Sequence, residues 1–200
     1  MWCSGANQYV SEQNEWTATI FLFLFDLPSD HEVDENLVTE CEVIRTVLAN
    51  RGFRSVVKAT RISSMDRFKS EPWRPYPNIG YVHLAAHGRK RGIGLIDGRM
   101  RWTTLARRLR IIAPRLAKDQ KRVLVLSCCY SSYGYEALQR PLRGHFTGCY
   151  YFEPNEIGFS DAMTTWAMFY KHKTIRRPHA AIVNRINSFF DEDILAFGSI

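Results

Sequence analysis

Two apolar runs of this chain end in side chains that can transfer protons or attack carbonyl groups. The first run covers residues 81–86 and is followed by His87, and the second covers residues 123–127 and is followed by the adjacent Cys128 and Cys129. Short runs rich in Val and Leu are typical of buried strands in a parallel sheet. Ligands bind at the carboxyl ends of such strands. The spacing therefore predicts an imidazole beside a thiol, the minimum for a cysteine nucleophile with a general acid and base.

A glycine directly after the histidine strengthens this prediction. In acyl transfer a thiolate attacks a carbonyl carbon, and a positioned imidazole later protonates the leaving amine. The oxyanion that develops needs backbone N–H donors, and Gly88 lets the backbone approach a substrate because it has no side chain. We expect the N–H groups of Gly88 and Cys129 to form this oxyanion hole.

Only one of the two adjacent cysteines can face such a site. Successive side chains of a strand point to opposite faces, so Cys128 should share a face with Leu126, and Cys129 with Ser127. We expect Cys129 to be the nucleophile and keep Cys128 as the alternative. The cysteines, five in all, are odd in number and show no disulfide spacing, which favours a reducing, cytoplasmic setting.

The elements that must position these residues alternate along the chain. Buried strands are expected over residues 17–25, 53–59, 79–86, 122–128 and 146–152. Helices are expected over residues 37–50, 63–68, from Thr103 or Thr104 to Ile112, and over 134–140, 160–170 and 178–190, with a hairpin turn at Asp97-Gly98. Such alternation predicts an α/β fold with a mostly parallel sheet flanked by helices. Residues 1–16 are expected to form an N-terminal arm, and residues 17–200 one domain.

Charge and composition narrow the function classes. The net charge is +7, yet residues 89–122 hold twelve basic and two acidic side chains, a local charge of +10. Such a basic strip can attract nucleic acid or an acidic partner, or it can be a solvated helix face. The apolar run over residues 20–25 is too short to span a bilayer, so no membrane association is expected.

Metal and cofactor chemistry receives little support from the sequence. His83 and His87 are four residues apart, so a zinc site that they share with a cysteine is the metal alternative. The zinc-protease motif needs a glutamate after the first histidine, where this chain has Leu84. We expect no metal and no cofactor. His145, His172 and His179 are expected on the surface, and Trp73, Trp102 and Trp166 in the packing.

The two segments resemble the caspase-like cysteine peptidases, most closely the CHAT type. The resemblance rests on Ala85-Ala86-His87-Gly88, on residues 94–98 (Gly-Leu-Ile-Asp-Gly) and on Val125-Leu126-Ser127-Cys128-Cys129. It implies a caspase-like three-layer sandwich, a His87–Cys129 dyad and endopeptidase activity on a protein or peptide substrate. A peptidase of this kind would be harmful in the cytoplasm if it were always active. We therefore expect a latent enzyme that a separate activating or sensor protein switches on, with residues 71–78 and 130–134 as the moving loops.

The chain departs from the family pattern in ways that affect specificity. Ser127 stands where some relatives have an acidic residue that holds a basic substrate side chain, so Arg or Lys specificity does not carry over. Glu153, Glu156 and Asp161 follow the fifth expected strand, where caspase-like enzymes build their specificity pocket, and they are candidates for substrate binding. The alternative function is a catalytically silent adaptor of the same fold that binds an acidic partner or, less favoured, nucleic acid through the basic strip.

Overall fold

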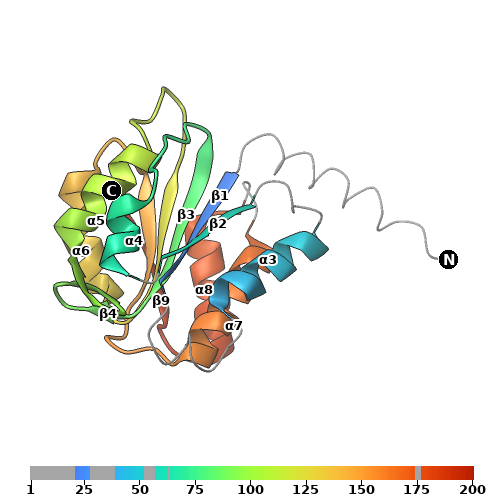
Figure 1. Ribbon diagram of the computed structural model, residues 1–200. Coiled ribbons are helices and arrows are strands. Elements are labelled where there is room, and N and C mark those ends of the chain that lie inside the picture. Colours follow the sequence, from blue (N-terminus) through green and yellow to red (C-terminus); the bar gives the residue numbers. More distant parts are fainter. Residues whose placement is uncertain (1–20, 28–38, 52–56, 63, 174–176) are drawn as a thin grey trace.

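The computed structural model describes residues 21–27, 39–51, 57–62, 64–173 and 177–200 (Figure 1). The N-terminal arm expected over residues 1–16 lies outside this part of the chain. The expected first strand over 17–25 is described only from residue 21, and the expected second strand over 53–59 only from residue 57.

A six-stranded, mostly parallel sheet forms the centre of the molecule (Figure 1). Its order is β2-β1-β3-β7-β8-β9. Each neighbouring pair is parallel except the last, in which β9 runs antiparallel to β8. The strands are β1 (Phe21–Leu27), β2 (Val57–Arg61), β3 (Ile79–Ala86), β7 (Val123–Ser127), β8 (Gly148–Phe152) and β9 (Leu195–Ser199).

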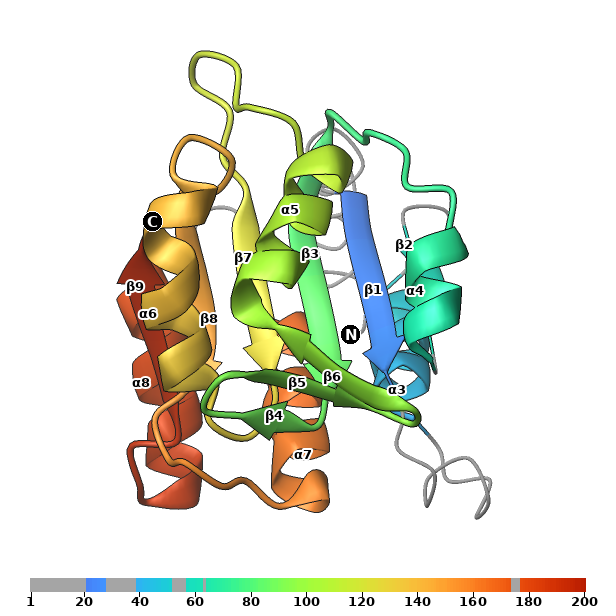
Figure 2. The ribbon, with the colours of Figure 1, turned by 60° about the vertical axis from the view of Figure 1, so that its left-hand side comes forward.

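Helices cover both faces of this sheet, as the alternating elements predicted. On one face lie α4 (Met65–Ser70), α5 (Trp102–Ile112) and α6 (Ser131–Leu142), and on the other lie α3 (Glu40–Asn50), α7 (Phe159–His172) and α8 (His179–Phe190) (Figures 1 and 2). No helix in the described part of the chain has the length and apolar character needed to cross a membrane.

A second, three-stranded antiparallel sheet lies below the carboxyl ends of β3 and β7 (Figure 2). It consists of β4 (Gly88–Arg89), β5 (Gly92–Leu95) and β6 (Gly98–Arg101) in that order. The turn between β5 and β6 contains Asp97, close to the predicted Asp97-Gly98 turn.

The central strands are buried on both faces because each face packs against its own layer of helices. Leu124 and Leu126 belong to the apolar cluster beside α5 and α6, whereas Val123 and Val125 belong to the cluster beside α7 and α8. All five residues of β7 are buried. This confirms the prediction of a fully buried strand before Cys128.

Several predicted boundaries are wrong for local reasons. Helix α5 begins at Trp102 after Arg101, without a threonine cap, because Trp102 is buried against the sheet. Helix α6 begins at Ser131, so residues 131–134 are its first turn and not a loop. Strand β9 was not predicted at all; it forms by pairing with β8.

Two histidines expected on the surface are in fact packed. His145 is 6% exposed, and its Nδ1 lies 2.8 Å from the carbonyl oxygen of Ala113. His179 stacks on Phe197 with ring centroids 3.8 Å apart, and its Nδ1 lies 2.6 Å from the hydroxyl of Tyr150. The three tryptophans pack as predicted: Trp166 and Trp102 are buried, and Trp73 lies against the core beside Phe68.

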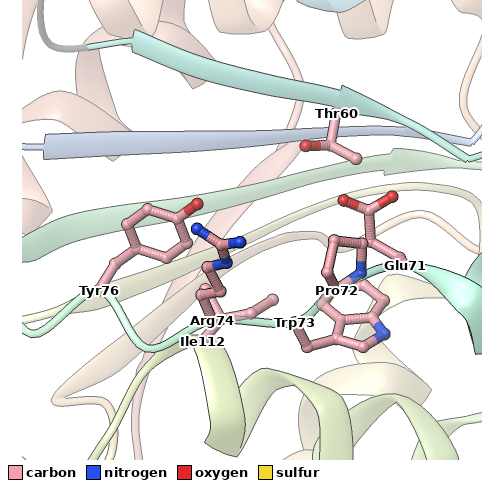
Figure 3. A pocket seen from close by; sticks show the side chains of 7 residues that line it. All are labelled: Thr60, Glu71, Pro72, Trp73, Arg74, Tyr76 and Ile112. Carbon is pink, nitrogen blue, oxygen red and sulfur yellow. The ribbon is translucent and has the colours of Figure 1, made fainter.

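A small pocket lies under the proline-rich segment before β3 (Figure 3). Its volume is about 150 Å³, and its lining residues are Thr60, Glu71, Pro72, Trp73, Arg74, Tyr76 and Ile112. The lining contains no cysteine or histidine, so this pocket is separate from the two segments that carry the predicted chemistry.

Candidate functional site at the carboxyl edge of the sheet

The sheet register brings the two predicted motifs side by side. Strands β3 and β7 are adjacent and parallel, and Ala85 pairs with Ser127 at their carboxyl ends. His87 and Cys129 each stand two residues further along the chain, just beyond the ends of these strands. Both residues therefore leave the same edge of the sheet at the same level.

Gly88 supplies the direct contact between the two segments. A Cβ atom at this position would stand only 1.7 Å from the carbonyl oxygen of Cys129 and 2.7 Å from its carbonyl carbon. Any side chain at residue 88 would thus displace the backbone of Cys129. The sequence predicted a close approach of this glycine to a substrate, and the structure shows that the glycine is needed first for a close approach to Cys129.

The hydrogen bonding of β4 leaves a donor of Gly88 available. The N–H of Gly94 donates to the carbonyl of His87 at 2.7 Å. Bonded and non-bonded pairs alternate in an antiparallel ladder, so the next pair, Gly88 with Ile93, is a non-bonded one. The N–H of Gly88 consequently points away from β5, as an oxyanion donor requires.

The two adjacent cysteines have opposite environments. Cys128 is 3% exposed and belongs to the apolar cluster beside α5 and α6, together with Leu126. Burial is the largest cause that raises the pKa of the Cys128 thiol well above its usual range. Cys129 is partly exposed, and His87 is exposed. Cys128 thus shares the face of Leu126, as predicted, and Cys129 is the more exposed of the two thiols.

Cys129 occupies a sharp turn between strand and helix. Tyr130 has a left-handed backbone conformation, with φ of 53° and ψ of 27°, and α6 begins at the next residue. Such a turn holds the preceding side chain out of the sheet, close to the helix N-terminus. The unpaired N–H groups and the dipole at a helix N-terminus stabilise negative charge, including a thiolate or an oxyanion.

The segment after β8 closes one side of the site. The Sγ of Cys129 donates to the carbonyl of Ile157 at 3.8 Å, and the N–H of Tyr130 donates to the carbonyl of Asn155 at 2.6 Å. The hydroxyl of Tyr130 donates to Glu156 at 3.3 Å, and this hydrogen bond is the main cause that raises the pKa of Tyr130. Residues 155–157 thus lie against the Cys129 turn.

The three acidic candidates for substrate binding have separate positions. Glu156 contacts Tyr130 beside Cys129. Glu153 directly follows β8, and burial and the charge of Glu153 raise the pKa of the neighbouring Tyr151 to about 12. Asp161 lies in the first turn of α7. Of the three, Glu156 is the one that the described contacts join to the Cys129 segment.

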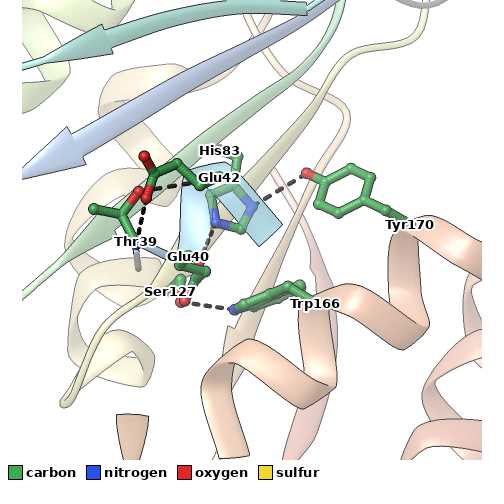
Figure 4. Close-up of polar contacts among 7 residues, drawn as sticks. All are labelled: Thr39, Glu40, Glu42, His83, Ser127, Trp166 and Tyr170. Atoms are coloured by element: carbon green, nitrogen blue, oxygen red, sulfur yellow. Dashed lines mark hydrogen bonds and ion pairs between the residues drawn. The ribbon is translucent and has the colours of Figure 1, made fainter. Parts of the chain in front are cut away.

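A buried polar network lies directly beneath this edge, and sequence reasoning missed it (Figure 4). Glu40 accepts a hydrogen bond from Ser127 at 2.6 Å with one carboxylate oxygen and contacts Nε2 of His83 with the other. The Nδ1 of His83 lies 3.1 Å from the hydroxyl of Tyr170, and Nε1 of Trp166 donates to Ser127 at 2.7 Å. All five side chains are at most 6% exposed.

The start of α3 explains how a carboxylate reaches this depth. Thr39 and Glu42 form a capping box: the Thr39 side chain accepts from the N–H of Glu42, and the Glu42 carboxylate accepts from the N–H of Thr39 at 2.8 Å. The cap fixes the first turn so that Glu40 shares a buried face with Ile44 and Leu48. The helix N-terminus also favours a negative charge at residue 40.

This network connects four elements below the candidate site. Ser127 precedes Cys129 by two residues on β7, and His83 precedes His87 by four residues along β3. Because satisfied buried polar networks specify one arrangement of their elements, Glu40 and its partners fix α3, β3, β7 and α7 relative to one another. They hold the two strand ends in register without contacting a substrate.

The structure does not support the zinc alternative. Both ring nitrogens of His83 already have partners, Glu40 and Tyr170. In the described parts of the chain, no three His, Cys, Asp or Glu side chains come together in a group that would hold a metal ion.

The basic strip includes one arginine that does not reach the surface. Arg122 is fully buried, where its guanidinium donates to the carbonyl groups of Ile79, Pro114, His145 and Pro77 and where burial lowers its pKa to about 10. Strands β4 and β6 carry their arginines at the carboxyl edge of the sheet, whereas the segment between α5 and β7 lies at the opposite end (Figure 2). Arg107, Arg108 and Arg110 lie between these two ends on α5, so the strip extends along the molecule without the buried Arg122.

Comparison with family models and with curated protein sequences finds no match to this chain.

Proposed function

We propose that this chain is a cysteine endopeptidase with a caspase-like fold of the CHAT type. The order of the parallel strands, the antiparallel last strand, the helices on both faces and the small sheet directly after His87 support the caspase-like sandwich. The observation that carries the proposal is the contact between Gly88 and the backbone of Cys129. It brings the histidine segment and the cysteine segment together at the carboxyl edge, where α/β folds bind ligands.

In the proposed reaction, Cys129 gives its thiol proton to His87, and the resulting thiolate attacks the carbonyl carbon of the scissile peptide bond. A bond forms between Sγ and the carbonyl carbon, and the N–H groups of Gly88 and Cys129 stabilise the oxyanion. His87 transfers a proton to the leaving nitrogen as the carbon–nitrogen bond breaks, which leaves an acyl-enzyme. Water then attacks this thioester, and His87 takes up one proton of the water. His87 passes this proton to Sγ as the carbon–sulfur bond breaks, which releases the carboxylic acid product and restores the free thiol.

The buried Cys128 and the buried network have no chemical step in this scheme. Glu156 contributes to substrate binding beside Tyr130, while Glu153 and Asp161 remain candidates for the same role. A separate activating protein, which relieves a latent state, stays part of the proposal. Residues 131–134 are helical, so Tyr130 is the one residue of the expected mobile loop 130–134 that lies outside α6.

To test the proposal, a peptide library is incubated with the purified chain or with a sample of it activated by lysate, and the products are identified by mass spectrometry. We expect Cys129→Ala and His87→Ala each to abolish cleavage, whereas the control His172→Ala, a partly exposed histidine on α7, keeps it. Undiminished cleavage by both site variants would exclude the proposed peptidase.

A second candidate function is a catalytically silent adaptor of the same fold. The exposed arginines on β4 and β6 favour it, because they offer a surface for an acidic partner. The adaptor predicts that no acylating probe modifies Cys129 in any state of the protein, while the peptidase predicts selective modification of that thiol.

A further inference from the structure

The two faces of the small antiparallel sheet differ in character. Gly88 pairs with Ile93, and Ile93 pairs with Met100. Ile93 and Met100 are 0% and 1% exposed, so this row of residues points into the core. Because successive side chains of a strand point to opposite faces, the rows on either side of it point to solvent.

The solvent face carries the candidate catalytic histidine and three arginines. One of these rows consists of Arg89, Gly92 and Arg101, which pair across the three strands. The other consists of His87, Gly94 and Arg99: Gly94 pairs with Arg99, and its N–H donates to the carbonyl of His87. Four side chains of these rows are exposed: His87, which directly precedes β4, and Arg89, Arg99 and Arg101. The imidazole proposed to protonate the leaving group thus shares one face with three guanidinium groups.

The middle strand leaves room for a ligand between them. On this face β5 presents Gly94, which is partly exposed and has no side chain, whereas Gly92 is buried. Neighbouring strands are about 4.8 Å apart, so the arginines of β4 and β6 flank a floor of backbone about 10 Å wide. An extended peptide fits such a width.

The small sheet has no carboxylate that neutralises the positive charge of this face. Its one carboxylate, Asp97, accepts a hydrogen bond from the N–H of Met65 at 2.7 Å and so serves the start of α4. Among the described residues, Arg89, Arg99 and Arg101 take part in no ion pair. Lys90 extends the positive charge toward Cys129, since its Nζ lies 6.0 Å from the ring centre of Tyr130.

We propose that this face binds acidic residues of the substrate on the leaving-group side of the scissile bond. The inference rests on the proposed peptidase function for its direction. His87 gives its proton to the leaving nitrogen, so the part of the substrate that follows the scissile bond passes over His87, and His87 lies on the arginine face.

A peptide matches the spacing of these cations. Arg99 and Arg101 are two residues apart on one strand, a separation of about 7 Å. Side chains on one face of an extended peptide repeat at the same interval, so alternate Glu or Asp residues can meet successive arginines.

The binding arm of the experiment uses the Cys129→Ala chain, which cannot cleave. Its probes are fluorescein-labelled peptides of alternating Glu and Ala or of alternating Gln and Ala, followed by fluorescence anisotropy. We expect the Glu peptide to bind at least about tenfold more tightly at low salt, with the difference shrinking as salt screens the charges. Replacement of Arg99 and Arg101 by Gln should remove most of this difference.

A matched control distinguishes this face from general positive charge. Arg140 and Arg143 are exposed at the far end of α6, and the variant with both replaced by Gln should bind the Glu peptide within about twofold of the parent. Equal losses in both double variants would overturn the inference. Equal binding of the Gln peptide and the Glu peptide would also overturn it. So would a single-stranded oligonucleotide that binds more tightly than the Glu peptide and whose binding the Arg99 and Arg101 replacements abolish.

The cleavage arm tests the direction. Substrates found in the library assay are resynthesised with Glu residues either before or after the scissile bond, and kcat/KM is compared in wild type and in the Arg99→Gln, Arg101→Gln variant. We expect the variant to lose activity only on substrates with Glu after the bond. Preference for Glu before the bond would contradict the inference. Absence of any cleavage would exclude the peptidase and with it the assigned direction, while the binding arm would still report on the acidic-ligand face.

Discussion

Strand β3 leads to two histidines, and their environments differ completely. His83 is fully buried and both its ring nitrogens have partners, whereas His87 is exposed just beyond the strand end. The adjacent cysteines repeat the contrast, since Cys128 lies in the core and Cys129 reaches solvent. The same residue types thus form a buried floor, Glu40, His83 and Ser127, and a reactive rim, His87 and Cys129.

The difference between floor and rim assigns different roles to the two regions. A buried polar group contributes to stability through its hydrogen bonds, and removal of one partner leaves the others buried without a hydrogen bond. An exposed or partly exposed side chain contributes less to folding and is accessible to a reagent. Variants of the floor should therefore change stability, and variants of the rim should change chemistry.

The largest effect on stability is expected for Glu40→Ala. This change leaves both His83 and Ser127 without a buried partner, so the free energy of unfolding should fall by about 3 kcal/mol or more. Urea unfolding followed by circular dichroism measures it. An unchanged unfolding midpoint would show that the network is not a structural floor.

The next largest effect is expected for Gly88→Ala, because Gly88 packs against the backbone of Cys129 between the floor and the rim. The new methyl group collides with the carbonyl of Cys129 and should cost about 2 kcal/mol of stability while it displaces the thiol. Gly94→Ala is the matched control, because its Cβ would meet its nearest atom at 3.5 Å, an ordinary contact. Equal stability of the two variants would refute the close approach at Gly88.

A smaller loss is expected for Ser127→Ala. The variant removes the hydrogen bond to Glu40 and the acceptor for Trp166, at a cost of about 1–2 kcal/mol. Ser160→Ala, at an exposed position in the first turn of α7, serves as the control and should unfold like the parent. If both serine variants unfold alike, Ser127 does not take part in the network.

The smallest effect on stability is expected at the rim. His87→Ala and Cys129→Ala remove side chains from exposed and partly exposed positions, so the free energy of unfolding should change by no more than about 0.5 kcal/mol. A loss as large as that of Glu40→Ala would erase the distinction between the two regions.

The rim was predictable from sequence and the floor was not. The apolar runs before His87 and Cys129 placed β3 over its observed residues and β7 within one residue at each end, and period-two alternation separated Cys128 from Cys129. Those signals are local. They required no knowledge of which helix covers which face.

The floor depends on residues far apart in the chain. Glu40 and Ser127 are 87 positions apart, and only the packing of α3 against the sheet joins them. One local signal was available, because Glu40 lies on the same helical face as Ile44 and Leu48, where a charged residue demands a buried partner. Arg122 was read as part of the basic strip for the same reason: its carbonyl partners lie in separate loops.

Strand β9 and the segment after β8 show a second limit. Residues 195–199 alternate weakly and include a glycine, so their strand is defined by pairing with β8 and not by their own pattern. The path that brings Ile157 and Glu156 to Cys129 and Tyr130 is likewise set by tertiary contacts.

The most direct test of the central claim is the rate at which a peptidyl acyloxymethyl ketone modifies Cys129, with the site of attachment found by mass spectrometry. We predict that modification occurs at Cys129 and not at the buried Cys128, and that His87→Ala slows it by about a hundredfold, while His172→Ala does not. Modification at Cys128, or an equal rate at Cys129 without the His87 imidazole, would contradict it.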